Sequence, residues 1–142
     1  MSDELRTLVT DASVILKWVL DSDDEPGRED AVAILESFVD GNLRLAVPSL
    51  WVYEVGNILS RKRPDTARDT MTALLDLGLE EVPLGSVLAG RTLELALDKG
   101  ITFYDASYVA VAENRDAGFV TADRRLAERL GQGFRVRLVG VE

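Results

Sequence analysis

Short apolar segments typical of strands alternate with helical segments along the whole chain, and this alternation constrains the fold more than any other feature. Such an order predicts an α/β domain with a mostly parallel central sheet and helices on its faces. The expected strands are Leu8–Thr10, Leu43–Val47, Leu79–Val82, Phe119–Thr121 and Phe134–Val139. The expected helices are Val14–Leu20, Glu29–Val39, Leu50–Arg61, one from Pro64 to Gly78, Ser86–Lys99, one opening at Asp105, and Asp123–Leu130.

Helix ends are marked by residues that satisfy free backbone groups. Ser13 and Ser49 stand at positions where a side-chain oxygen caps the first turn of a helix. Gly100 is expected to end the helix before it, because glycine adopts the left-handed conformation easily.

The chain has 142 residues, of which 46% are hydrophobic, so we expect one domain spanning 1–142 with a sizeable core. Its amino-terminal segment lacks the basic and apolar regions of a signal peptide. No apolar run approaches the length of a membrane span. These features predict a cytoplasmic protein without a membrane segment.

The sequence contains no histidine and no cysteine. This absence excludes a Ser-His-Asp triad, a thiolate zinc site and a disulfide framework. Any bound metal is therefore expected to be a hard cation held by oxygen ligands.

Four acidic residues stand where a ligand site of such a sheet is expected. Asp11, Asp105 and Asp123 are placed at strand-to-helix junctions, and Glu54 lies early in its helix. Ligands bind beyond the carboxyl ends of parallel strands, so these side chains are expected to share one edge. Helix capping by the aspartates, and a solvated helix face for Glu54, are the simpler alternatives. Burial of carboxylates in apolar surroundings, as at Glu54 and Asp105, is costly without a cation or partner.

Four segments of the chain resemble, in order, the acidic motifs of the PIN domain. They are VTDASVILKW, PSLWVYEVGNIL, ITFYDASYVAVAE and GFVTADRRLA, and they span Val9 to about Leu130. The closest resemblance is to the VapC-type toxins of type II toxin–antitoxin pairs. It implies a three-layer α/β/α sandwich and an endoribonuclease that depends on Mg²⁺ or Mn²⁺.

The resemblance also implies roles for individual residues. Asp11, Glu54, Asp105 and Asp123 become the catalytic, metal-binding acids. Three polar residues, Ser13, Asn57 and Thr121, are implied to lie beside these acids and to orient them or the water. Each of the three also has a purely structural alternative, as a helix cap, an exposed polar residue and a strand hydroxyl respectively.

The chemistry of such a site needs no histidine. Divalent cations can hold an attacking water and the leaving oxygen of a phosphodiester in line and lower the pKa of the water. Water, and not the ribose 2′-hydroxyl, then attacks, so products with 5′-phosphate and 3′-hydroxyl ends are expected.

Net charge is an objection to RNA binding. The chain carries 16 basic and 25 acidic residues, a net charge of −9, whereas phosphate contacts need Lys and Arg. The charge is uneven, however, because Arg115 to Arg137 contains six Arg and three acids. We hypothesise that Arg124, Arg125 and Arg129 contact the RNA backbone; the alternative is a solvated helix face.

The resemblance further implies a cognate VapB-type antitoxin and a homodimer. The apolar faces of Val14–Leu20 and Glu29–Val39 are candidates for an antitoxin groove, unless they are entirely core. The acidic segment Asp21–Asp30 is a candidate for receiving basic antitoxin residues. Trp51 and Tyr53 are candidates for a dimer interface, although both residue types are more often core.

Other functions compete with the toxin hypothesis. A stand-alone PIN nuclease in RNA processing and a non-catalytic PIN-fold binding module share the fold. A receiver or phosphatase using Asp11 is disfavoured, because position 13 is Ser and no Lys follows a late strand.

Overall fold

The computed structural model describes residues 5–20 and 26–140. No helix within those ranges is long and apolar enough to cross a membrane. The strands are β1 (Thr7–Thr10), β2 (Arg44–Pro48), β3 (Glu80–Val82), β4 (Gly118–Thr121) and β5 (Val136–Leu138). The helices are α1 (Ala12–Val19), α2 (Arg28–Val39), α3 (Trp51–Lys62), α4 (Ala67–Leu75), α5 (Ser86–Lys99), α6 (Phe103–Asn114) and α7 (Arg124–Leu130).

The five described strands form one parallel sheet in the order β3-β2-β1-β4-β5. β1 is central, with Leu8 opposite Leu45 on β2 and Gly118 on β4. Its last three residues are buried, as expected for a strand covered on both faces. All carboxyl ends of the strands therefore meet at one edge of the sheet.

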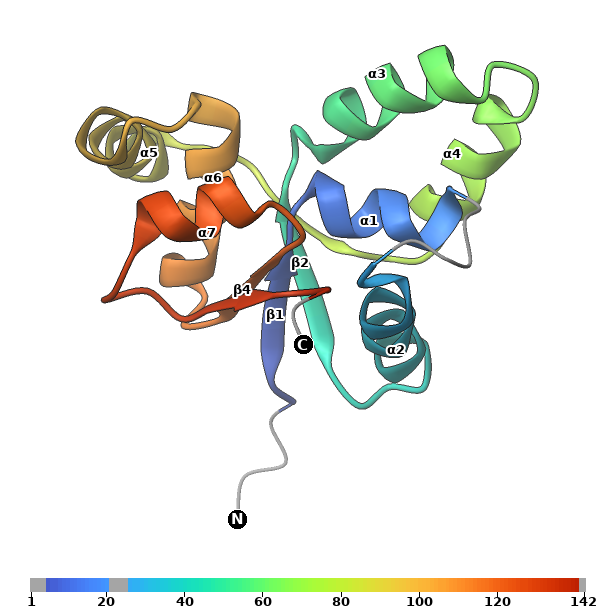
Figure 1. Ribbon diagram of the computed structural model, residues 1–142, viewed down its shortest axis with the longest axis horizontal. Helices are drawn as coiled ribbons and strands as arrows, with labels where there is room; N and C mark the ends of the chain where they lie inside the picture. Colours follow the sequence, from blue (N-terminus) through green and yellow to red (C-terminus); the bar gives the residue numbers. More distant parts are fainter. Residues whose placement is uncertain (1–4, 21–25, 141–142) are drawn as a thin grey trace.

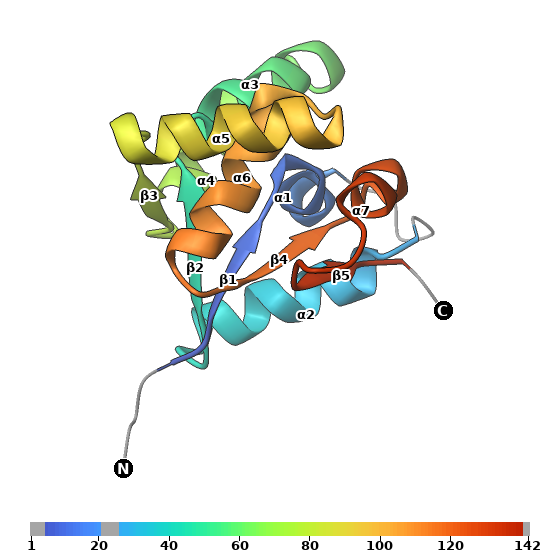
Figure 2. The same cartoon turned by 90° about the vertical axis from the view of Figure 1, so that its left-hand side faces the viewer.

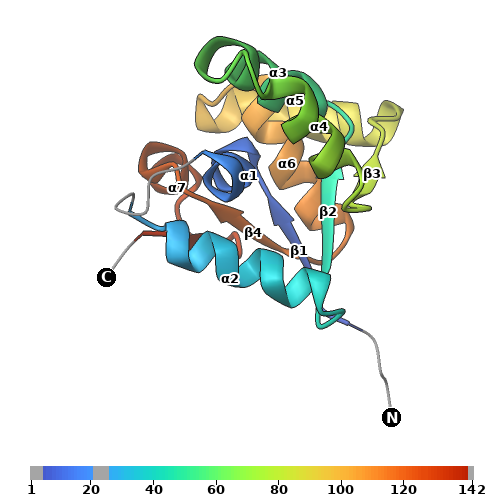
Figure 3. The same cartoon turned by 90° about the vertical axis from the view of Figure 1, so that its right-hand side faces the viewer.

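Helices cover both faces of the sheet, so the three-layer α/β/α sandwich is confirmed. Helices α1 to α4 lie on one side, and α5 to α7 lie on the other (Figure 1). Seen from the second side, α6 lies in front of β2 and beside β1, and β1 leads up to the start of α1 (Figure 2). From the opposite side, α2 lies across the front, below α1 (Figure 3).

The core lies between the sheet and these helices. As its apolar sequence predicts, α6 is buried from Ala106 to Ala112. Trp51 is also buried, whereas its neighbour Tyr53 is exposed and does not belong to the core.

The helices expected to form an antitoxin groove use their apolar faces in the core. Val14, Ile15 and Trp18 of α1 and Ile34 of α2 are buried in one hydrophobic cluster. Much of these faces therefore lies in the core, whereas Val39 at the end of α2 is 64% exposed, and an antitoxin groove here stays a prediction. Of the acidic segment Asp21–Asp30, residues 21–25 lie outside the described residues.

Two predicted helix caps are wrong. The N-cap of α1 is Asp11, whose side chain accepts from the Val14 backbone N–H, and Ser13 lies inside the first turn. The N-cap of α3 is Leu50, without a side-chain hydrogen bond, so Ser49 does not cap it. For α1, Asp11 and Ser13 offer similar capping chemistry, and the end of β1 places Asp11 at the N-cap position. For α3, no side-chain cap is used.

Two glycines hold the entry of α2 against the end of β5. Gly27 and Gly140 have φ values of 84° and 86°, which other residues adopt only with strain. A Cβ on Gly27 would lie 2.9 Å from the Gly140 backbone nitrogen, so the two backbones touch directly. This contact ties α2 to the carboxyl-terminal edge strand.

Gly27→Ala should therefore destabilise the fold more than Gly41→Ala. Gly41 has a similar φ of 80° but has nothing within 4 Å of an added Cβ, so it isolates the cost of the left-handed conformation. We expect about 1–2 kcal/mol for Gly41→Ala, and a clearly larger loss of unfolding free energy for Gly27→Ala. Urea unfolding of both variants measures this, and equal losses would contradict the backbone contact.

Candidate active site

Asp11 is the most buried acid of the predicted quartet. It follows β1 directly, caps α1, and its side chain is only 4% exposed. Thr121 Oγ1, at the end of β4, donates to Asp11 Oδ2 at 2.6 Å, and Ser13 Oγ donates to Oδ1. The two hydroxyls that were expected to support the acids thus both donate to one carboxylate.

The environment of Asp11 favours its protonated form. Burial raises its pKa from 3.8 to about 6, although hydrogen bonds from Ser13, Thr121 and Val14 oppose the shift. The negative charge of Asp105 adds a smaller increase. At neutral pH the fold therefore holds a buried carboxylate that lacks sufficient compensation.

The end of β4 connects Asp11 to Asp123. Thr121 Oγ1 accepts from the Asp123 backbone N–H at 3.0 Å while its proton points at Asp11. Ser13 Oγ accepts from the Ala122 backbone N–H at 2.9 Å. Asp123 itself caps α7 by accepting from the Leu126 N–H, so the capping alternative holds for both Asp11 and Asp123.

Glu54 faces the site from the first turn of α3. Its pKa is raised, first by burial and then by the charge of Asp105. Its Oε1 atom is buried and has no hydrogen-bond partner among the described residues. The Tyr108 hydroxyl is near enough to favour the ionised form of Glu54, yet it too lacks a partner of good hydrogen-bond geometry there.

Asp105 connects the quartet electrostatically. Burial raises its pKa, and the charge of Asp123 raises it further. Its own charge acts on Asp11 and on Glu54, so it lies within electrostatic range of the other three acids. The expected strand-to-helix junction at Asp105 is wrong, since α6 follows α5 and begins at Phe103.

The acids gather without forming a finished ligand set. Across residues 5–20 and 26–140, no three carboxylates are drawn together tightly enough to hold a metal ion as they stand. The carboxylates nevertheless repel one another, and one buried Glu54 oxygen has no hydrogen-bond partner among the described residues. A bound cation would relieve both of these unfavourable features. Oxygen donors of this kind suit Mg²⁺ or Mn²⁺.

The three candidate RNA-binding arginines lie in two different hollows. Arg125 and Arg129 line a hollow together with Asp105 and Asp123. Arg129 also donates to the Gly100 carbonyl at 3.0 Å, at the end of α5. Arg124 instead lines a separate hollow with Lys17 and residues at the end of β5.

Two contributors to the site were missed by the sequence reasoning. Thr102 caps α6 by accepting from the Asp105 N–H, which fixes the backbone of that acid. Tyr108 lies one turn after Asp105 and is buried beside Glu54. The three-residue spacing from Asp105 was the available signal, because it puts Tyr108 on the same helix face.

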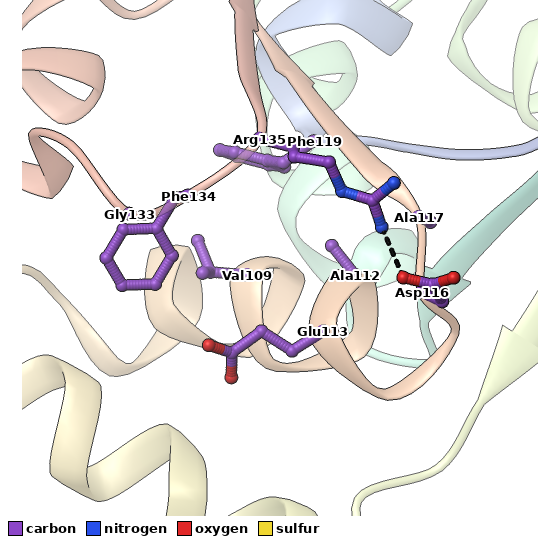
Figure 4. Close-up of a pocket in the computed structure, with 9 residues that line it drawn as sticks. All are labelled: Val109, Ala112, Glu113, Asp116, Ala117, Phe119, Gly133, Phe134 and Arg135. Atoms are coloured by element: carbon purple, nitrogen blue, oxygen red, sulfur yellow. Dashed lines mark hydrogen bonds and ion pairs between the residues drawn. The ribbon is translucent and has the colours of Figure 1, made fainter.

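A further pocket lies away from the acids. It is lined by Val109, Phe119 and Phe134, and the Arg135–Asp116 ion pair at 2.7 Å lies across it (Figure 4). Asp116 precedes β4, so this pocket is at the opposite end of that strand from Thr121. It is therefore separate from the acidic site.

Comparison with known proteins identifies relatives of the chain in sequence and in fold. Ribonuclease VapC3 of Pyrobaculum aerophilum is 32% identical over 130 residues, covering 86% of this chain and 93% of that protein. Exonuclease VapC9 of the same organism is 38% identical over 91 residues, 58% of this chain; the match spans 65% of that relative. The structure of VapBC2 from Rickettsia felis, bound to a promoter DNA fragment, superposes with a TM-score of 0.70 at 16% identity, covering 93% and 98% of the two chains.

Residues 8–130 match the model of the PIN domain family, and this range contains all four acids. The match covers most of the chain, and the fold agrees with it. The chain therefore belongs to the PIN-domain family, and its sequence relatives are VapC proteins.

Proposed function

We propose that the protein is a metal-dependent endoribonuclease and the toxin of a VapBC-type toxin–antitoxin pair. One observation carries the proposal: a nearly inaccessible carboxylate, Asp11, is kept in electrostatic range of the half-buried Asp105 at the carboxyl edge of the sheet. Helix capping accounts for the position of Asp11 but not for a second carboxylate held in its range, which a cation site would use.

The residues present fit a hard divalent cation. Asp11, Glu54, Asp105 and Asp123 would hold Mg²⁺ or Mn²⁺, and the buried Glu54 oxygen, which has no hydrogen-bond partner in the described part of the chain, would gain a ligand contact. When bound, the cation would supply Lewis acidity and activate water against an RNA phosphodiester, consistent with 5′-phosphate and 3′-hydroxyl products.

The surrounding residues preorganise these carboxylates. Thr121 and Ser13 hold both oxygens of Asp11 in fixed directions, and Thr121 simultaneously holds the Asp123 backbone. Tyr108 and the buried face of α6 keep water away from one side of Glu54. Supporting groups of this kind commonly affect metal affinity 10- to 100-fold.

The names of the relatives support nuclease activity and leave its mode open. One relative is named a ribonuclease and the other an exonuclease. An endonuclease remains our proposal, with a stand-alone PIN nuclease and a binding module as alternatives. An antitoxin partner is supported by the VapBC assembly of the Rickettsia structure. We also propose that the protein forms a homodimer and acts in the cytoplasm, where it would meet RNA and the antitoxin.

The buried Asp11 gives a pH signature to the metal-free protein. Its pKa is 3.8 when free and about 6 when folded, so the folded protein holds the proton over a wider pH range. The stability gained from that proton is present at low pH and is lost as pH rises through about 6. Relative to Asp11→Asn, the wild type should lose about 2 kcal/mol of unfolding free energy between about pH 4 and pH 7.

Urea unfolding of both proteins with a chelator, at a series of pH values, measures this difference. The variant keeps the shape of the side chain but has no proton to lose, so other titrating groups largely cancel. If the difference in unfolding free energy between the two proteins does not change with pH, burial does not raise the pKa of Asp11.

RNA cleavage tests the proposed activity directly. Total RNA and a circular RNA are incubated with antitoxin-free protein, with Mg²⁺, Mn²⁺ or a chelator, and new 5′ ends are sequenced. We expect discrete cuts with 5′-phosphates only when metal is present. Asp105→Asn should reduce the rate by at least about 100-fold, because Asp105 couples to all three other acids.

The substrates separate the alternatives. Cleavage of the circle establishes endonuclease action, whereas an exonuclease spares it. If the folded wild type and Asp105→Asn behave alike on every RNA with every metal, the nuclease proposal is wrong and a binding module is left.

The two hollows predict different roles for neighbouring arginines. Arg125→Ala should weaken RNA binding and reduce the slope of log affinity against log salt by about 0.7, since one phosphate contact is lost. Arg124→Ala is the matched control, because Arg124 lines the other hollow. Binding isotherms at several salt concentrations measure both, and equal effects of the two variants would remove the assignment.

A further inference from the structure

Two exposed tyrosines lie next to the acids, and core packing does not account for aromatic residues at these positions. Tyr53 immediately precedes Glu54 on α3, and Tyr104 immediately precedes Asp105 on α6. Tyr53 is 79% exposed and Tyr104 is 57% exposed, so neither ring contributes much to the core. They come from different layers of the sandwich and nevertheless line the same pocket.

This aromatic pocket consists of Ala12, Tyr53, Glu54, Asn57, Ile58 and Tyr104. Its volume of about 450 Å³ is in the range of small-ligand sites. It borders the acidic site directly, because Glu54 belongs to both and Ala12 follows Asp11. A group bound here is therefore adjacent to the carboxylates.

The charge of the protein limits what that group can be. With a net charge of −9 and an acid in the pocket wall, the pocket repels phosphate and offers no basic side chain to bind it. An aromatic ring binds a nucleic-acid base through stacking, which does not depend on the charge of the backbone. The exposed Asn57 adds a carboxamide, with donor and acceptor, in the same wall.

We propose that the aromatic pocket binds one unpaired RNA base next to the scissile phosphate, through the rings of Tyr53 and Tyr104, with Asn57 contacting the edge of the base. The inference rests on the proposed ribonuclease function and adds to it a pocket for a single base, formed by named residues. In duplex RNA the base faces are already stacked, so the pocket selects against paired substrates.

The test uses an oligoribonucleotide that carries 2-aminopurine, a fluorescent base whose emission falls when it stacks. The full chain carries Asp123→Asn to suppress cleavage, because Asp123 does not line this pocket. Tyr53→Ala and Tyr104→Ala are each compared on that background with the phenylalanine variants, which retain stacking. Val39→Ala on α2 is the control, since Val39 is an exposed apolar residue on another element.

We expect each alanine variant to weaken binding by roughly tenfold or more and to lose the fluorescence change. The slope of affinity against salt should stay the same, because stacking releases no counterions. The phenylalanine and Val39→Ala variants should bind like the unsubstituted background, and a duplex of the same sequence should bind weakly.

Three results would overturn the inference, and cleavage by the wild type distinguishes them. If the wild type cuts RNA but the alanine variants bind and quench normally, only the aromatic pocket is wrong. If those variants lose affinity for the antitoxin and not for RNA, the pocket is an antitoxin site. If the wild type neither binds nor cuts RNA, the proposed function fails together with the inference.

Discussion

The hydrogen bonds that hold the Asp11 carboxylate are the interaction on which the rest of the site depends. Thr121 and Ser13 donate to its two oxygens, and through Thr121 the ends of β1 and β4 are locked together. The same threonine oxygen receives the Asp123 N–H, so one hydroxyl sets the relative positions of two acids that are distant in sequence. Burial nevertheless costs more than these bonds return, since the pKa of Asp11 is raised to about 6. The buried charge of Asp11 therefore destabilises the metal-free fold, and a bound cation would reduce this cost.

The α6 helix explains how so acidic a cluster is tolerated. Its apolar length packs against β1, β2 and β4 and brings Asp105 to the edge where the other acids lie. Thr102 fixes its first turn, and Tyr108, one turn further, fills the space beside Glu54. The core packing of α6 therefore offsets the repulsion between the carboxylates.

Charge and exposure divide the surface around this site. Arg125 and Arg129 lie beside Asp105 and Asp123, whereas the exposed tyrosines lie on the Glu54 side. If the protein acts on RNA, phosphate and base would be recognised in two different hollows beside the acids. A chain with net charge −9 would then depend less on electrostatic attraction than most nucleic-acid-binding proteins do.

The sequence by itself determined the alternation of strands and helices and the resemblance to the PIN-domain family. Those features follow from local apolar patterns and from motif order, which the chain carries without reference to its fold. It did not determine that Asp11 and not Ser13 caps α1, or that Asp105 follows a helix. Nor did it reveal that Tyr108 supports Glu54, or that Arg124 and Arg125 face different hollows. Only the tertiary structure decided these, because burial and electrostatic coupling depend on which elements pack together, and neighbours in the sequence can point in opposite directions.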